Sequence, residues 1–344
     1  MNDTTTKDAV LEVKGLHVQL PTPDGPLGAV NDVALSIAPG KTLCVVGESG
    51  CGKSMTSLAI MGLLPRSAKV PQGRIEFHGD NLLDLNQSQL SDLRGDRIAM
   101  IFQEPMTSLN PVFTIGDQLS EVLRRHRKVS RKEARARAVE LLELVGISGA
   151  ERRLGQYPHQ LSGGLRQRVM IAMALMCEPE LLIADEPTTA LDVTIQAQIL
   201  ALLKKIQTEL GTAIMLITHD LGVVGRIADT VAVMYAGQVV ETGTAEQIFS
   251  DPLHPYTQGL LRCIPIPGKT ARGARLGTIK GVVPNLVGEQ TGCRFYARCE
   301  FAHDACRANV ALREFEGAHP ARCVRDISDM RTTQPDLSAS EVAS

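Results

Sequence analysis

The segment Ser162-Gly163-Gly164 has the residue types of an anion-binding site at the start of a helix. A hydroxyl side chain and exposed backbone N–H groups at a helix N-terminus attract phosphate oxygens. The chain also has a fuller phosphate motif, since residues 47–54 match G-x-x-x-x-G-K-[ST]. That loop already holds the phosphates of a nucleotide bound to this chain. The Ser-Gly-Gly site must therefore serve a nucleotide on another subunit, which predicts a dimer with nucleotide at the interface.

The loop at residues 47–54 predicts how a nucleoside triphosphate is held. Backbone N–H groups around its glycines surround the phosphates, Lys53 neutralises the β and γ oxygens, and the Ser54 hydroxyl is placed to ligate Mg²⁺. Cys51 needs to supply only its backbone. The expected nucleotide contacts are Gly47, Glu48, Ser49, Gly50, Cys51, Gly52, Lys53, Ser54 and Met55.

Polar residues also follow the apolar strands that we predict downstream. Asp185 and Glu186 come directly after residues 181–184, and His219 follows residues 214–217. Open α/β sheets bind ligands at the carboxyl ends of their strands. Asp185 can hold the metal through water, Glu186 can polarise an attacking water, and His219 can sense the γ-phosphate. The alternatives are two acids that cap a strand and a histidine that caps a helix.

The order of the expected elements indicates an α/β fold. Short apolar runs between residues 11 and 37 predict strands joined by turns, and residues 42–46 predict a buried strand that leads into the phosphate loop. Residues 54–64 have helical spacing. A capping box at residues 130–133 opens a helix that we expect to reach Leu144.

Changes in composition suggest the domain organisation. The pattern turns to Pro, Gly and Cys with weak periodicity past residue 262, where we place a boundary. A nucleotide-binding domain then covers residues 1–262, with a hairpin at 230–242 and a helical subdomain at about 104–178. A small Cys-rich extension covers residues 263–327, and residues 328–344 form a flexible polar tail.

Composition excludes some classes of protein. The 344 residues have a net charge of -2, 3% aromatic residues and no Trp, which argues against nucleic acid as the main partner. Basic residues gather between Arg124 and Arg137, but acidic residues among them favour a solvated helix face over a nucleic-acid or lipid site. The longest apolar run is too short to span a bilayer, and no signal peptide is visible, so we expect a cytoplasmic chain.

Several of these segments together resemble the ATP-binding cassette (ABC) family. The resemblance rests on residues 161–164, Gln103, the turn Ala190-Leu191-Asp192 and His219, and it runs from about Leu11 to Gly259. It implies a RecA-like P-loop NTPase core with an antiparallel β subdomain and a helical subdomain. It also implies ATP and Mg²⁺ as ligands, and two cassettes that close head to tail around two ATP molecules.

The resemblance implies roles for single residues. Gln103 senses the γ-phosphate, ligates Mg²⁺ together with Ser54 and Asp185, and contacts the membrane subunit. Glu186, Gln103 and His219 are the catalytic residues, with His219 as the switch histidine. Residues Ser162, Gly163 and Gly164 bind the partner's γ-phosphate, and Asp192 crosses the dimer seam.

The chain departs from the family pattern at two places. Leu165 stands where the family has Gln, which removes one polar contact but leaves the Ser and the glycines. The aromatic residue that stacks on adenine is missing, because the candidate positions are Leu20 and Leu27. Selectivity for ATP over other nucleotides is therefore open.

A finer resemblance to the dipeptide/oligopeptide (and nickel) importers rests on residues 101–111, 186–192 and 254–257. The extension agrees with it, since importers of this branch have a four-cysteine element that can hold a [4Fe–4S] cluster. The expected ligands are Cys293, Cys299, Cys306 and Cys323, whose spacing contains no C-x-x-C zinc motif. The alternative is four unligated thiols that pack a small subdomain.

The resemblance predicts an ATPase subunit that energises import of dipeptides or oligopeptides. Its expected partners are a second, non-identical cassette, two transmembrane permease subunits and an extracytoplasmic peptide-binding protein. Such a chain lies at the cytoplasmic face of the bacterial inner membrane as a peripheral subunit. The alternatives are a soluble ABC ATPase of DNA repair or translation, and a cassette that binds ATP without hydrolysis.

Overall fold

The computed structural model describes residues 9–103, 108–189, 192–264, 277–284, 286–288 and 290–331. The chain divides into two compact units. Unit 1 consists of Met1–Val10, Ile37–Lys41 and Leu82–Ile217, and unit 2 of Leu11–Ser36, Thr42–Asn81 and Thr218–Ser344. The predicted motif residues Glu104 to Thr107, Ala190 and Leu191 lie outside the described residues.

Unit 1 contains a parallel sheet of buried strands. β6 (Ile98–Ile101) pairs with β7 (Leu181–Asp185), and β7 pairs with β8 (Ala213–Thr218). Every residue of β7 and β8 is buried, as expected for strands covered on both faces. The predicted α/β class is confirmed. Because β6, β7 and β8 run in one direction, the residues that follow them meet at one edge.

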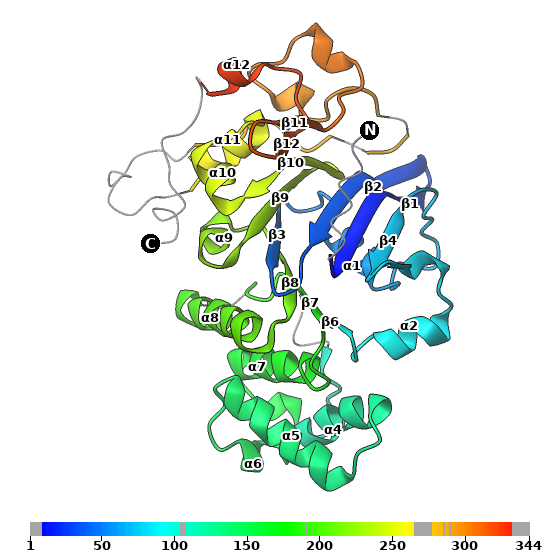
Figure 1. Cartoon of the computed structure of the whole chain (residues 1–344), viewed down its shortest axis with the longest axis vertical. Helices are drawn as coiled ribbons and strands as arrows, with labels where there is room; N and C mark the ends of the chain where they lie inside the picture. Colours follow the sequence, from blue (N-terminus) through cyan, green and yellow to red (C-terminus); the bar gives the residue numbers. More distant parts are fainter. Residues whose placement is uncertain are drawn as a thin grey trace. The chain divides into compact units, whose positions relative to one another are not determined.

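The helical part of unit 1 consists of α4 (Ile115–His126), α5 (Arg131–Leu144), α6 (Ala150–Arg153) and α7 (Gly163–Ala174), drawn in green in Figure 1. The capping box that opens α5 is confirmed, because Ser130 accepts from the Glu133 N–H and Glu133 accepts from the Ser130 N–H. Unit 1 also contains α2 (Gln87–Leu93) and α8 (Val193–Leu210).

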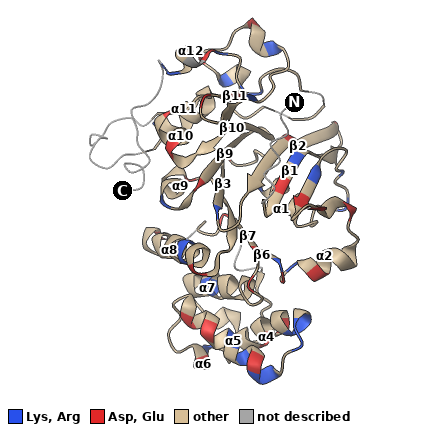
Figure 2. Cartoon of the chain, viewed as in Figure 1, with Lys and Arg blue, Asp and Glu red and all other residues tan. Residues whose placement is uncertain are grey.

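Basic and acidic residues alternate along α4 and α5 (Figure 2). Arg135 contacts Glu151 at 2.7 Å, and Arg137 contacts Glu140 and Glu178, each at 2.7 Å. These ion pairs support the interpretation of the basic stretch as a solvated helix face.

Unit 2 contains an antiparallel sheet and the strand that leads into the phosphate loop. The sheet order is β2 (Gly25–Ile37), β1 (Leu11–Thr22), β4 (Arg74–Phe77) and β5 (Asp80–Asn81). β3 (Thr42–Val46) is fully buried and lies parallel to β9 (Thr230–Tyr235). β9 and β10 (Gln238–Thr244) form the predicted hairpin. The short helices are α9 (Leu221–Ile227), α10 (Ala245–Ser250) and α11 (Pro255–Arg262).

The helix after the phosphate loop, α1 (Lys53–Ile60), is shorter than we expected. The prediction that it reaches Leu64 is wrong, because Gly62 has a left-handed φ of 61°. The Gly62 N–H donates to the Ala59 carbonyl, and the Leu63 N–H donates to the Leu58 carbonyl. This pair of bonds is a Schellman motif, which ends a helix at a glycine.

The C-terminal extension belongs to unit 2 and continues its sheet. β12 (His319–Ala321) pairs with β10 and with β11 (Arg313–Phe315). The short helices η3 (Tyr296–Arg298) and η4 (Asp304–Arg307) and helix α12 (Ile327–Arg331) complete it. The boundary near residue 262 stays a prediction. Of the predicted tail, residues 328–331 lie in α12 and residues 332–344 lie outside the described part.

A buried carboxylate connects this extension to the rest of unit 2. Glu241, fully buried in β10, accepts from the backbone N–H groups of Leu253 and His254 at 2.7 and 2.9 Å. Its other contact is the ring of His319 in β12, at 2.8 Å. Among the described residues, no helix is long and apolar enough to cross a membrane.

Candidate nucleotide-binding site

Two glycines of the phosphate loop lie where only glycine fits. Gly47 has a φ of 153°, and a Cβ there would lie 2.1 Å from the Met234 carbonyl oxygen. Gly52 has a φ of 101°, and its Cβ would lie 2.5 Å from the Ala29 carbonyl oxygen. The loop is therefore packed against backbone of β9 and β2 within unit 2. These contacts fix the path of the loop without a nucleotide.

Lys53 lies at the start of α1, with its side chain directed at the loop. Its Nζ donates to the carbonyl oxygens of Gly47 and Glu48 at 2.8 and 3.1 Å. The first N–H groups of a helix have no intrahelical acceptor, so the start of α1 can bind an anion. Burial raises the pKa of the Cys51 thiol, so that this side chain is a neutral packing group. The loop thus presents a cation and a helix N-terminus.

Gln103 and Glu186 meet in unit 1, as the strand order predicts. The Gln103 Nε2 donates to Glu186 Oε2 at 3.1 Å, and the Thr189 hydroxyl donates to the same oxygen at 2.8 Å. The Glu186 N–H donates to the Ile217 carbonyl, and Glu186 has a left-handed φ of 47°. Asp185 precedes it as the buried last residue of β7. An oriented carboxylate at this edge is able to accept a proton from water.

His219 lies in unit 2, in the segment between β8 and α9, and its side chain is exposed. Our alternative interpretation, a histidine that caps the helix, is wrong. Asp220 is the N-cap of α9, because its Oδ1 accepts from the Gly222 N–H at 2.9 Å.

The Ser-Gly-Gly segment opens α7 in unit 1. Ser162 is the N-cap residue, and its hydroxyl accepts from the Leu165 N–H at 3.4 Å. The cap thus uses only the backbone N–H of residue 165, which is present with any side chain at this position. A Cβ on Gly164 would lie 3.4 Å from Ile195 of α8, and Asp192 caps α8 by accepting from the Ile195 N–H at 3.0 Å. The N-termini of α7 and α8 are therefore neighbours.

Gly163 differs from the glycines of the phosphate loop. Its φ lies outside the left-handed region, and a Cβ there would meet no atom of this chain within 4 Å. Ser162 and Gly163 are both exposed. Neither backbone conformation nor packing within the described chain requires glycine at this position.

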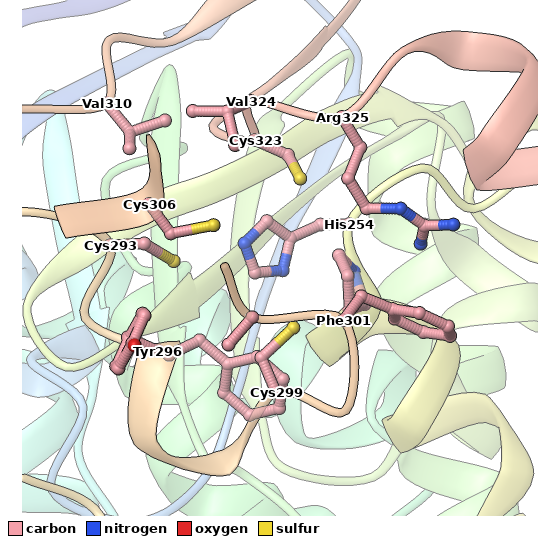
Figure 3. Close-up of a pocket in the computed structure, with 13 residues that line it drawn as sticks. His254, Cys293, Tyr296, Cys299, Phe301, Cys306, Val310, Cys323, Val324 and Arg325 are labelled. Atoms are coloured by element: carbon pink, nitrogen blue, oxygen red, sulfur yellow. The ribbon is translucent and has the colours of Figure 1, made fainter. Parts of the chain in front are cut away.

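The four cysteines of the extension line one cavity in unit 2 (Figure 3). The cavity volume is about 10 Å³, and the lining is otherwise mostly apolar and aromatic. Burial raises the pKa of Cys293 and Cys299 to about 11 and also raises the pKa of Cys323. Within the described part of the chain, no group of three or more metal-ligating side chains is arranged to hold a single metal ion.

Sequence reasoning missed two residues that contact the phosphate loop. The Tyr256 hydroxyl accepts from the Glu48 N–H at 2.9 Å, and Arg298 forms an ion pair with the Glu48 carboxylate at 2.7 Å. Tyr256 belongs to the motif at residues 254–257, and Arg298 precedes Cys299. The sequence contains no signal for either contact, because both partners are about 200 or more positions away from Glu48.

The parallel sheet, the phosphate loop and the Ser-Gly-Gly helix start define the nucleotide-binding subunit of an ABC protein. The ABC transporter family model matches residues 30–189, and the model of the oligopeptide/dipeptide transporter C-terminal region matches residues 240–306. The chain belongs to the ABC transporter ATP-binding proteins of the dipeptide/oligopeptide importer family, and it is an ABC-type ATPase that energises transport.

Several peptide transport ATP-binding proteins are similar to this chain. A putative peptide import ATP-binding protein of Brucella melitensis is 52% identical, over 93% of this chain and 98% of the relative. The dipeptide transport ATP-binding protein DppD of Bacillus subtilis is 55% identical, over 85% and 87%. The oligopeptide transport ATP-binding protein OppD of Escherichia coli is 48% identical, over 94% and 95%.

Solved structures show the same fold. The ATP-binding cassette MJ0796, in a dimeric post-hydrolysis state bound to ADP and Pi, is similar with a TM-score of 0.62. It is 30% identical, over 68% of this chain and 98% of that chain. The prediction of an ABC cassette fold is confirmed.

Proposed function

We propose that this chain hydrolyses ATP to drive the import of dipeptides or oligopeptides, with Glu186 as the general base. The observation that carries the catalytic assignment is the pair of hydrogen bonds from Gln103 and Thr189 to Glu186 Oε2, which orient the carboxylate at the edge where the parallel strands end. The proposal for the cargo is supported by the similarity to peptide importers and by the C-terminal region typical of them.

The remaining roles follow from the chemistry of each group. Lys53 neutralises the β and γ phosphates when nucleotide replaces the loop carbonyls as its partner. Ser54, Gln103 and Asp185 supply oxygen ligands of the kind that Mg²⁺ takes, and the metal offsets phosphate charge. His219 contacts the γ-phosphate as the switch residue.

A second cassette completes the site. Ser162, Gly163 and Gly164 bind the γ-phosphate held by that partner, and Asp192 lies at the same interface. The open space around Gly163 supports this role, because a glycine that its own chain does not need leaves room for a ligand from outside. We propose that the partner is a non-identical cassette and that two permease subunits and a peptide-binding protein complete a transporter at the cytoplasmic face of the inner membrane.

Peptide uptake by the assembled transporter in proteoliposomes tests the function. We expect ATP hydrolysis that rises with peptide-loaded binding protein, and a Glu186→Gln chain that still binds ATP but hydrolyses it about 100-fold more slowly. Glu246→Gln, on α10, is the matched control and should leave the rates of ATP hydrolysis and of peptide uptake unchanged. Unchanged ATP turnover in Glu186→Gln would refute the assignment of Glu186 as the general base. If the assembled transporter took up no peptide in the presence of ATP, the assignment of peptides as the cargo would be refuted.

We also propose that the cysteine cavity holds a [4Fe–4S] cluster. Four thiols around one cavity are the number that such a cluster takes, one for each iron. A single zinc ion would instead need all four sulfurs about 2.3 Å from one point. Bound iron would supply a covalent link between segments of the extension, and Cys293, Cys299, Cys306 and Cys323 would be its ligands.

Anaerobic purification tests the cluster. We expect a brown protein that absorbs near 400 nm and loses both its iron and this absorbance on Cys299→Ser. Cys263→Ser is the control, since Cys263 is not in the cavity lining and its thiol donates to the Gly259 carbonyl. A colourless, iron-free protein that contains zinc would overturn the proposal.

A further inference from the structure

Glu48 is an acidic residue inside a loop that binds phosphate. Its carboxylate is paired with Arg298 by two parallel hydrogen bonds, Nη1 to Oε2 at 2.7 Å and Nη2 to Oε1 at 3.0 Å. The Arg298 side chain is only 6% exposed and the Glu48 side chain 25%. A forked, largely desolvated pair of this kind is stronger and more directional than an exposed ion pair.

Arg298 is itself held in place by its neighbours. Its Nε donates to the Lys280 carbonyl at 2.9 Å, and its Nη1 lies 3.3 Å from the Tyr235 hydroxyl. The guanidinium lies 5.6 Å from the ring centre of Tyr235 and 5.9 Å from that of Phe295. These contacts restrict the orientations that the guanidinium can adopt.

The backbone of Glu48 is fixed as well. Its N–H donates to the Tyr256 hydroxyl, and its carbonyl accepts from Lys53 Nζ. Tyr256 is fully buried, and burial raises its pKa, so that it remains a neutral phenol. Side chain, N–H and carbonyl of one loop residue thus each have a partner, and two of the three partners lie after residue 250.

The charge of Glu48 explains why these contacts matter for a nucleotide. A carboxylate in the phosphate loop repels the polyphosphate unless a cation neutralises it. Lys53 is committed to the phosphates, so the second cation must come from elsewhere. Arg298, in η3 of the C-terminal extension, supplies it.

We propose that Arg298 is a positioning residue for ATP binding: it neutralises and orients Glu48, so that the C-terminal extension sets the phosphate affinity of the loop. This inference rests on the proposed role of the loop in binding ATP. It gives the extension a function in the nucleotide site of this chain, in addition to any metal that it binds.

Calorimetric titration of the purified full chain with Mg²⁺ and a non-hydrolysable ATP analogue, and with Mg²⁺ and ADP, tests the proposal. Arg298→Met keeps the apolar stem but removes the charge, and it should weaken binding of the ATP analogue about tenfold. ADP has less charge and should lose only about threefold. Adding Glu48→Gln to Arg298→Met should restore the ATP-analogue affinity to within about threefold of the original.

Arg262→Met is the matched control. Arg262, the last residue of α11, pairs with Glu300 of the extension at 2.8 Å, and both side chains of this pair are exposed. The control should change neither affinity. If Arg298→Met does not fold, Arg298→Lys keeps the charge without the fork and should lose about threefold.

The outcomes separate this inference from the proposed function. An original chain that binds no nucleotide would refute the proposed function itself. If the original chain binds, three results would each overturn the inference: unchanged affinity in the Arg298 variants, an equal loss in Arg262→Met, or no recovery in the double variant. A role of Arg298 in stability alone would lower the melting temperature of Arg298→Met but leave its affinity for the ATP analogue unchanged.

Discussion

The glycines of the phosphate loop and of the Ser-Gly-Gly segment are required for different reasons. Gly47 and Gly52 are crowded by backbone of their own unit, because an added Cβ would lie 2.1 and 2.5 Å from a carbonyl oxygen. Gly163 has open space at the same position. Gly47 and Gly52 of the phosphate loop are thus required by packing within this chain. Gly163 of the Ser-Gly-Gly segment is not required by such packing, which fits a role in binding a ligand from outside the chain.

The largest effect is expected for Gly47→Ala. A methyl group cannot occupy a position 2.1 Å from the Met234 oxygen, so the loop must move. We expect the free energy of unfolding to fall by about 3 kcal/mol and nucleotide binding to be lost. Chemical denaturation and calorimetric titration measure the two effects. A stable variant with normal affinity would show that the loop is not fixed by β9.

Lys53→Ala should lose affinity with less effect on stability. The change removes the cation that neutralises the phosphates, and we expect ATP to bind about 100-fold more weakly. Titration of the purified chain measures this, and thermal unfolding serves as the control for folding. Full ATP turnover by this variant would refute the assignment of the phosphate loop.

The sequence predicts the elements around the phosphate loop and around the Ser-Gly-Gly segment because the sequence patterns that specify them are local. The phosphate loop lies between a strand and a helix as expected, and Gln103 and Glu186 meet because parallel strands end at one edge. The capping box at Ser130 is equally local. Such features depend on residues a few positions apart or on a simple sheet rule.

Contacts between distant segments could not be predicted in the same way. Arg298 reaches Glu48 through the fold of the extension, and nothing in the spacing of Pro, Gly and Cys residues specifies that approach. The helix after the loop ends early for a local reason that helical periodicity does not reveal, a left-handed glycine at position 62. Asp220 rather than His219 caps the helix after β8, because its short acidic side chain reaches the Gly222 N–H.

Gly163→Asp sharpens the comparison between the phosphate loop and the Ser-Gly-Gly segment. A carboxylate at a helix N-terminus is favourable, and the position is open, so the isolated chain should be as stable as the original or gain about 0.3–1 kcal/mol. The same carboxylate repels a phosphate held by a partner. We expect ATP affinity of the isolated chain to be unchanged but ATP turnover of the assembled transporter to fall about 30-fold. If Gly163→Asp lost stability, or if it kept full ATP turnover in the assembled transporter, the hypothesis that Gly163 lies in a site for the partner's nucleotide would be contradicted.

The smallest effect is expected for Leu165→Gln, which restores the residue typical of the ABC signature. The Ser162 hydroxyl accepts from the backbone N–H of residue 165, so the cap is the same with either side chain. An added amide can donate to the partner's phosphate only as one bond among several. We expect turnover of the assembled transporter to change by no more than about twofold, since one water-exposed hydrogen bond contributes little. A tenfold increase in turnover would show that the side chain at position 165, and not only the helix N-terminus, sets the strength of phosphate binding at the Ser-Gly-Gly segment.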